Sequence, residues 1–195
     1  MALDQAIAFL TTSSATPPAP ESVVEALLGA EKRAKQAKVP STYKQLLGTW
    51  RLGFITGTKR SRQKAGVILG SGRFVPKWVK IQLSYSQSEA EQERGTVKNS
   101  VEFGLLQLIV TGPTQFWSHK SILAFDFTRM KVLFSGLKLY DGYIRGGKER
   151  EANFYERSLK DQAFFTYFLI ENHCIAARGR GGGLALWTRV MLSQD

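Results

Sequence analysis

Apolar and polar positions alternate with a period of two through most of the chain after residue 48. Trp50, Leu52 and Phe54 fall at alternate positions of one short segment. A second alternating series runs through Val97, Asn99, Val101 and Phe103. Side chains of a β-strand point alternately to the two faces of the sheet, so this period predicts strands with one buried face.

Similar runs recur along the chain, near Val79–Tyr85, Leu123–Phe127, Lys131–Ser135, Ala163–Ile170, His173–Arg178 and Leu184–Val190. Glycine- or proline-containing turns separate most of them, at Gly70–Gly72, Thr111–Pro113, Gly146–Gly147 and Gly181–Gly183. About eight to ten short strands at this spacing predict an all-β fold. Because closure protects sheet edges and the inward positions are rich in aromatic residues, we expect an antiparallel β-barrel rather than a sandwich.

The first 47 residues follow other patterns. A short helix is expected over Leu3–Leu10, followed by a Ser-, Thr- and Pro-rich linker over Thr11–Pro20, and residues 1–20 together are expected to form a flexible N-terminal segment. Residues 21–47 are expected to form a helical extension, with a helix over Glu21–Lys38 and a short helical turn ending at Leu47. The apolar stripe of the longer helix is predicted at Val24, Leu27 and Leu28. Residues 48–195 are predicted to form the barrel.

Composition narrows the class of protein. Hydrophobic residues make up 43% of the 195, which suffices for a substantial core. No long apolar run is free of charge, so no transmembrane span is expected. The single Cys174 allows no internal disulfide and suits a reducing compartment. Ala2–Leu10 lacks the basic start of a signal peptide, so we expect an intracellular protein.

The formal net charge of +11 draws the chain toward polyanions. One loop gathers Lys59, Arg60, Arg62 and Lys64. We interpret this cluster as a basic surface that faces an anionic membrane, with an ordinary solvated loop as an equal alternative. We do not expect nucleic-acid binding, because the aromatic residues lie mostly at inward positions rather than exposed for base stacking.

Four stretches in order carry a family resemblance: Leu47–Phe54 with its Gly48-Thr49-Trp50, Val97–Phe103, Phe164–Tyr167 and Ala177–Leu186. The first is similar to the opening motif of lipocalins. Together they resemble the plastid-lipid-associated proteins, or fibrillins, of plastids and cyanobacteria, over roughly Glu21 to Val190. The resemblance implies a lipocalin-like barrel, association with thylakoids or plastoglobules, and binding of carotenoids, prenylquinones or other lipids. It implies no catalytic residues.

The candidate ligand contacts are mostly aromatic, and they are Phe54, Asn99, Phe103, Phe125, Phe127 and Phe134. The aromatic residues could equally fill the core. Asn99 is the polar exception. Since a buried amide without a partner costs roughly 1–3 kcal/mol, Asn99 either bonds to neighbouring backbone, which we favour, or meets a quinone carbonyl or carotenoid hydroxyl.

Trp50 is expected to close one end of the barrel as a structural residue rather than to touch a ligand. A cation from the last strands would stack on it, and both Arg178 and Arg189 are candidates. The Arg178–Gly183 tract is similar to an RNA-binding or anion-binding sequence. A tight hairpin turn explains its glycines better.

Catalytic and metal-binding patterns are not expected. His119 and His173 belong to no cluster with metal-ligand spacing. Cys174 follows His173 directly, and adjacent strand residues point to opposite faces, so we expect no thiol–imidazole pair. Nucleophile-elbow, phosphate-loop and dinucleotide motifs do not occur in the sequence. We therefore predict no enzyme, no metal and no cofactor beyond a bound carotenoid, prenylquinone or lipid.

We hypothesise that the chain binds or carries a hydrophobic small molecule at photosynthetic membranes. Its expected location is the cyanobacterial cytoplasm or thylakoid surface, or, for a processed plastid form, the plastid stroma, thylakoid or plastoglobule. The main alternative is a structural protein of lipid droplets or membrane surfaces without an internal ligand. An enzyme acting on an isoprenoid or tetrapyrrole inside the barrel is a further alternative, for which no acid–base pair can be named.

Overall fold

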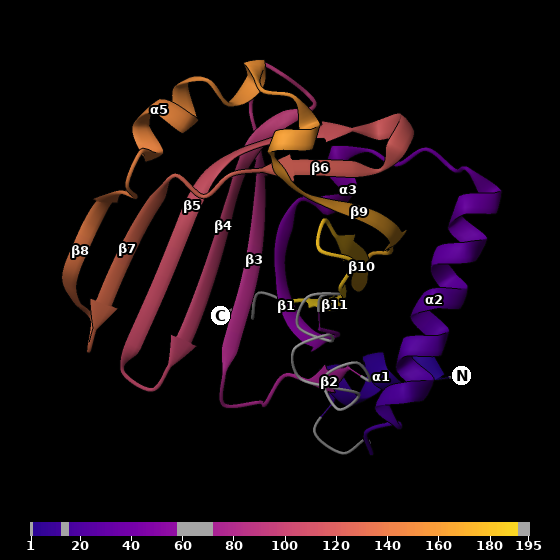
Figure 1. The fold of residues 1–195 in the computed structure, drawn as a ribbon. Coiled ribbons are helices and arrows are strands. Elements are labelled where there is room, and N and C mark those ends of the chain that lie inside the picture. The colour runs from indigo at the N-terminus through magenta and orange to yellow at the C-terminus, as the bar shows by residue number, and fades with distance from the viewer. Residues whose placement is uncertain (1, 13–15, 58–71, 191–195) are drawn as a thin grey trace.

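The computed structural model describes residues 2–12, 16–57 and 72–190, and it is mainly β with a few helices (Figure 1). Eight antiparallel strands close into a barrel: β1 (Gly48–Ile55), β3 (Lys80–Gln87), β4 (Arg94–Phe103), β5 (Leu106–Trp117), β6 (Ile122–Phe125), β9 (Ala163–Ile170), β10 (Cys174–Gly179) and β11 (Leu184–Arg189). The predicted antiparallel β-barrel is confirmed. The barrel closes where β4 pairs with both β3 and β5.

Three further strands of the described part of the chain lie outside this ring. The two-residue β2 (Arg73–Phe74) pairs with β1. A hairpin of β7 (Arg129–Phe134) and β8 (Leu137–Tyr143) extends the sheet beyond β5. The first half of β5 pairs with β7 and its second half with β6, so the barrel wall divides along β5. One half of the molecule is therefore a closed barrel, and the other half is a curved sheet that ends at β8, which has no second partner strand among the described residues (Figure 1).

The predicted turn at Thr111–Pro113 is wrong, because β5 runs straight through it. Pro113 has no N–H to donate to a neighbouring strand. Gly112 lets another segment come close, since a Cβ built there would lie 1.9 Å from the carbonyl oxygen of Asp126. At these residues β5 changes its partner from β7 to β6. The segment that connects β6 to β7 passes beside them.

Helices close and cover the barrel. The short α3 (Tyr43–Leu46) contributes Tyr43 and Leu46 to the core inside the barrel. On the outer face, α1 (Ala2–Thr11) and α2 (Pro20–Ala37) pack over β9, β10 and β11 (Figure 1). Among the described residues, the other helical segments are η2 (Ser118–Lys120), α5 (Gly147–Ala152), η3 (Phe154–Glu156) and η4 (Leu159–Asp161).

The short helix predicted over Leu3–Leu10 is confirmed as α1, but this part of the N-terminal segment is packed rather than flexible. Its Ala6 and Ile7 are buried against the outer face of the barrel, in a second apolar core with Cys174 and Leu186. This burial supplies the free energy that orders the helix.

The helix predicted over Glu21–Lys38 is confirmed as α2, but its buried stripe differs by one position. Leu27 is fully buried as expected, whereas Leu28 is 45% exposed and Val23 is buried in its place. Glu31 also lies on the buried face. Its carboxylate accepts hydrogen bonds from Arg178 of β10 at 2.8 and 2.5 Å, which ties α2 to the barrel wall.

The expectation that Phe54 shares a face with Trp50 and Leu52 is wrong. The pairing of β1 with β11 shifts between Leu52 and Phe54, which marks a β-bulge. An extra residue in one strand reverses the faces of the residues that follow it. Phe54 therefore points to the outer face, where it packs in the core beneath α1 and α2.

Candidate functional site

The closed half of the barrel is filled by large side chains whose polar atoms find partners. The Tyr85 and Tyr167 hydroxyls are 2.7 Å apart, and the Tyr43 hydroxyl lies 2.6 Å from that of Thr114. Burial raises the pKa of Tyr43 to about 12, and it also raises the pKa of Tyr85 and Tyr167. The three tyrosines thus stay neutral hydroxyls. This half of the barrel is packed core.

Trp50 has the structural role expected for it. Its indole N–H donates to the Leu46 carbonyl at 2.7 Å, and the Arg189 guanidinium stacks on its ring at 4.0 Å from the centroid. Arg189 also donates to the Leu47 carbonyl at 3.0 Å. Of the two candidate cations, Arg189 is the partner, because the guanidinium of Arg178 is occupied by Glu31 and the Gly182 carbonyl.

The open half of the barrel has an apolar inner face. Three rows of directly opposed residues cross its strands. The inner row holds Leu83, Asn99, Val110 and Met130. The middle row holds Ile81, Val101, Leu108, Val132 and Tyr140. The outer row holds Phe103, Leu106, Phe134 and Leu137.

These rows form a gradient of burial. Beyond the inner row, toward the closed half, Tyr85 and Val97 are buried in the core. The inner and middle rows are mostly half-buried, and we call them the open trough. The outer row is exposed, and Leu137 shows 70% of its surface. At about 3.3 Å per residue and 4.8 Å per strand, the face measures about 13 Å along the strands and 19 Å across them.

Asn99 is the polar residue of the open trough. We expected its side chain to bond to neighbouring backbone. The structure differs for the side-chain oxygen, because Oδ1 is buried and has no hydrogen-bond partner. Within residues 2–12, 16–57 and 72–190, Gln162 Oε1 is the other buried side-chain oxygen in this state. Gln162 lies elsewhere, and its amide N–H donates to the Phe154 carbonyl at 2.6 Å. An unpaired buried acceptor costs about 1–3 kcal/mol.

The structure distributes the predicted ligand contacts over three places. Asn99 lies in the open trough, and Phe103 and Phe134 lie at its exposed end. Phe125 is buried in the closed half with Phe127 packed against it, the ring centroids 5.3 Å apart. Phe54 is on the outer face. Only three of the six therefore border one accessible apolar surface.

Several trough residues were not among the predicted contacts, notably Leu108, Val110, Met130 and Val132. Met130 lies between two polar residues, but Ile109 separates Leu108 from Val110 and Leu133 follows Val132, so the other three show no alternation with polar neighbours. The position of these residues beside Asn99 could not be read from the sequence either, because it depends on which strands pair and in which register.

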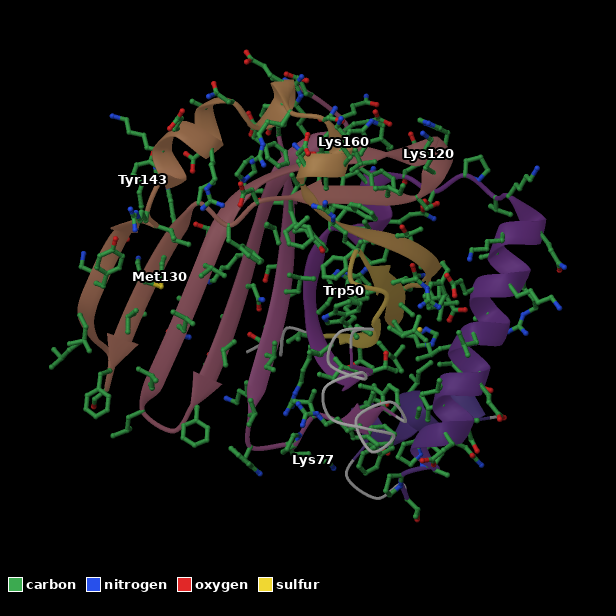
Figure 2. All side chains as sticks on the ribbon, viewed as in Figure 1. Trp50, Lys77, Lys120, Met130, Tyr143 and Lys160 are labelled. Carbon is green, nitrogen blue, oxygen red and sulfur yellow. The ribbon has the colours of Figure 1, made fainter. Side chains whose placement is uncertain are left out.

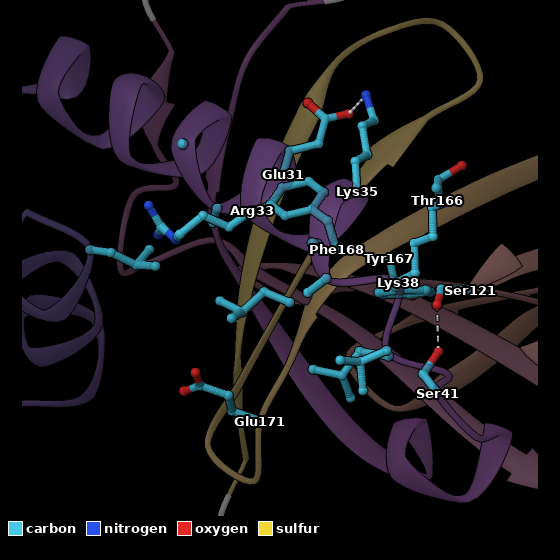
Figure 3. A pocket seen from close by; sticks show the side chains of 18 of the residues that line it. Glu31, Arg33, Lys35, Lys38, Ser41, Ser121, Thr166, Tyr167, Phe168 and Glu171 are labelled. Carbon is cyan, nitrogen blue, oxygen red and sulfur yellow. Dashed lines mark hydrogen bonds and ion pairs between the residues drawn. The ribbon is translucent and has the colours of Figure 1, made fainter. Parts of the chain in front are cut away.

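A second hollow lies outside the barrel, between α2 and β9 (Figure 3). It has a volume of about 1090 Å³. Phe168 and Ile170 contribute apolar surface, and charged side chains of Glu25, Arg33 and Lys35 line it as well. At one end the Ser41 hydroxyl donates to that of Ser121 at 2.7 Å. This mixed lining suits an apolar cargo less well than the open trough does.

Two predicted basic features have different outcomes. Lys59, Arg60, Arg62 and Lys64 lie outside the described residues. The turn predicted within Arg178–Gly183 is confirmed, since this tract joins β10 to β11 and Gly182 has a φ of +84°.

The turn between β9 and β10 brings Glu171, His173 and Cys174 together, with possible ligand atoms within 4.8 Å of one another. The expectation that neither histidine belongs to such a cluster is corrected for His173. It lies in the turn before β10, where strand alternation does not apply. The His173 Nε2 is 3.4 Å from Glu171, to which the Cys174 thiol also donates at 3.7 Å. Burial raises the pKa of this thiol to about 12, which opposes the thiolate that a metal requires.

Comparisons with known proteins add little to this geometry. No family model matches the chain, and no curated protein matches its sequence. Among solved structures, a redesigned β-barrel superposes with a TM-score of 0.38 and 11% sequence identity, covering 77% of this chain and 100% of that one. No helix in the described part of the chain has the length and apolar character of a membrane span. The closed barrel is compatible with the binding of a small molecule.

Proposed function

We propose that the chain binds a hydrophobic small molecule that carries a hydroxyl group, in the open trough. The observation that carries the proposal is the partnerless Oδ1 of Asn99 at the inner end of an otherwise apolar surface. An acceptor without a donor calls for a ligand that donates a hydrogen bond. The fitting group is therefore a hydroxyl, rather than a quinone carbonyl.

The apolar part of the ligand would lie along the inner and middle rows. Each methylene-sized group that leaves water contributes about 0.8 kcal/mol, so burying several of them offsets the cost of association. The resemblance to plastid-lipid-associated proteins supports an isoprenoid as the ligand, such as a hydroxylated carotenoid or a prenylated phenol, at photosynthetic membranes. We propose a carrier or binding protein rather than an enzyme, since the trough lining supplies no acid–base pair.

The test compares an isoprenoid phenol with its methyl ether, which has the same shape but no donor. We expect the phenol to bind the parent protein about tenfold more tightly than the ether, as one net hydrogen bond of about 1.4 kcal/mol predicts. The isosteric Asn99→Leu variant should bind both compounds equally. Equal affinities in the parent protein, or unchanged discrimination in the variant, would remove Asn99 from the site.

A structural protein that coats lipid surfaces without a cargo is the second candidate. The exposed outer row favours it, because large apolar side chains in water mark a contact with a partner or a lipid surface. Under this alternative the parent protein would bind vesicles but neither compound of the pair.

A further inference from the structure

The exposed apolar side chains of the chain are concentrated at one end of the open half. Of eleven large hydrophobic side chains that the described residues expose, seven lie there, and we call them the apolar rim: Trp78, Phe103, Leu105, Leu106, Phe134, Leu137 and Leu139. They come from the segment before β3, the β4–β5 turn and the β7–β8 hairpin, which end on the same side of the molecule (Figure 1).

Contacts between these segments make the apolar rim continuous. The rings of Trp78 and Phe103 meet edge to face with centroids 5.3 Å apart. Leu106 lies opposite Phe134, and the Ser135 N–H donates to the Leu105 carbonyl at 2.8 Å, which links the two turns. The rim is therefore one surface rather than scattered side chains, and such surfaces mark interaction sites.

The charges around the apolar rim are mainly positive. Lys77 lies at this end (Figure 2), and Lys80, Lys131 and Lys138 flank the rim on β3, β7 and β8. Two acids are interspersed. Glu102 pairs with Lys80 at 3.5 Å, and Asp141 lies 3.2 Å from Lys131 and 3.6 Å from Lys138. Four lysines against two acids leave two positive charges in excess beside the apolar surface.

We infer that the apolar rim docks into the surface of an anionic lipid bilayer. Narrow hairpin turns present their apolar side chains along the strand axis, which suits insertion between headgroups. An exposed tryptophan is typical of the bilayer interface, and lysines beside it meet anionic headgroups, each contributing to attraction. A second copy of the chain would instead be expected to cover the free edge of β8 as well as the rim.

Docking at this end would place the outer row in the bilayer and the open trough directly above it. A hydrophobic molecule could then pass from the membrane to Asn99 without crossing water. This route rests on the proposed function, whereas docking of the rim stands on the exposed side chains alone.

The first experiment is sedimentation with vesicles of phosphatidylcholine and phosphatidylglycerol in equal parts. The rim variant combines Leu105→Gln, Leu137→Gln and Leu139→Gln, all at exposed positions. A matched control combines Leu28→Gln and Val39→Gln, which remove exposed apolar surface near α2. We expect the partition coefficient of the rim variant to fall about tenfold or more, and that of the control to stay within about twofold of the parent.

The second experiment follows tryptophan fluorescence and needs no substitution in the hairpin turns. Trp78 is 67% exposed, whereas Trp50 and Trp187 are buried. Trp117 is half-buried and lies at the end of β5 opposite to the rim, so Trp78 dominates any response to lipid at the rim. Vesicles should shift the emission of the parent protein to the blue, and brominated lipids should quench it. The Trp78→Phe variant should show neither effect.

Three results would overturn docking: no vesicle binding by the folded parent, equal binding by the rim variant, or a parent dimer that the rim variant converts to a monomer. The last result would assign the rim to a second copy. Phenol binding by the rim variant keeps the two proposals separate. If the rim variant discriminates phenol from ether but binds no vesicles, both the proposed function and the docking of the rim stand. If the parent protein binds vesicles but no phenol, only the proposed function is removed.

Discussion

At the scale of single residues, Asn99 is the position where stability and binding conflict. Its Oδ1 is buried without a partner, while the tyrosine hydroxyls of the closed half are paired. Natural proteins keep such unfavourable groups mainly where a function requires them.

We predict that Asn99→Leu raises the free energy of unfolding of the ligand-free protein by about 1–2 kcal/mol. The variant removes an unpaired acceptor and adds apolar contact at nearly constant volume. Urea unfolding followed by tryptophan fluorescence measures the change. Asn99→Asp serves as the opposite control, because a carboxylate at this site should destabilise the protein. A loss of stability in Asn99→Leu would show that the amide already has a partner.

Arg189 acts as part of the plug at the closed end of the barrel. We predict that Arg189→Met lowers the free energy of unfolding by about 2–3 kcal/mol, since it removes the stack on Trp50 and the bonds to the Leu47 and Asn172 carbonyls. Arg180→Met is the matched control. The Arg180 side chain is exposed and donates to the Gln162 carbonyl, and its backbone bond to Phe164 is kept in the variant, so a cost below about 1 kcal/mol is expected. Equal costs for the two variants would contradict the role given to Arg189.

The sequence predicted residue roles where they depended on local pattern. Trp50 as a plug with a stacked arginine is an example, although the choice between Arg178 and Arg189 required the register of the last strands. The face of Phe54 could not be predicted, because a bulge at Gly53 reverses it. A Cβ at Gly53 would come within 2.3 Å of the Leu10 side chain, and that long-range contact leaves no local signal.

At the scale of elements, Gly112 fixes the division of the sheet. We predict that Gly112→Ala lowers the free energy of unfolding by about 3 kcal/mol, because the added methyl would overlap the Asp126 carbonyl, a backbone atom that cannot rotate away. Gly29→Ala in α2 is the control. The space there is sufficient and alanine is the better helix former, so stability should rise by about 0.5–1 kcal/mol. Chemical unfolding measures both, and a neutral Gly112→Ala would show that the segment between β6 and β7 can move away from β5.

The attachment of α2 to the barrel should depend on pH. Hydrogen bonds from Arg178 hold the pKa of Glu31 below its ordinary value. Stability from this pair is therefore complete at neutral pH and is lost as the pH falls through the folded-state pKa. Unfolding measured between about pH 6 and pH 3 should show a steeper loss for the parent than for Glu31→Gln.

The matched control for this pH dependence is Glu25→Gln, at an exposed position of the same helix. It should retain the steep loss of the parent protein. If the stability of the parent protein and that of Glu31→Gln fall in parallel with pH, the Glu31–Arg178 pair does not tie α2 to the barrel.

Elements with one buried face were predictable, and elements without one were not. The strands β3 and β4 follow the alternation in the sequence. In β8 the first five residues are all exposed, so it has no buried face and no alternation to detect. β5 was hidden for another reason. Its Gly112-Pro113 pair is typical of a turn, and only the approach of Asp126 explains why the strand continues.

At the scale of the whole molecule, the fold combines a packed barrel with an open sheet. The closed half supplies stability through its buried aromatic core, and the open half leaves a graded apolar face free. The barrel was predictable from the number and spacing of strands. The open trough was not, because it arises from the partition of β5 between β6 and β7.

Binding in the open trough is tested most directly by methyl NMR of the protein during titration with the isoprenoid phenol. We predict that methyl resonances of Val101, Leu108, Val110 and Val132 shift together, while those of Leu27 and Leu186, in the second apolar core outside the barrel, stay in place. Shifts confined to residues around the hollow between α2 and β9, or no shifts at saturating phenol, would contradict binding in the open trough.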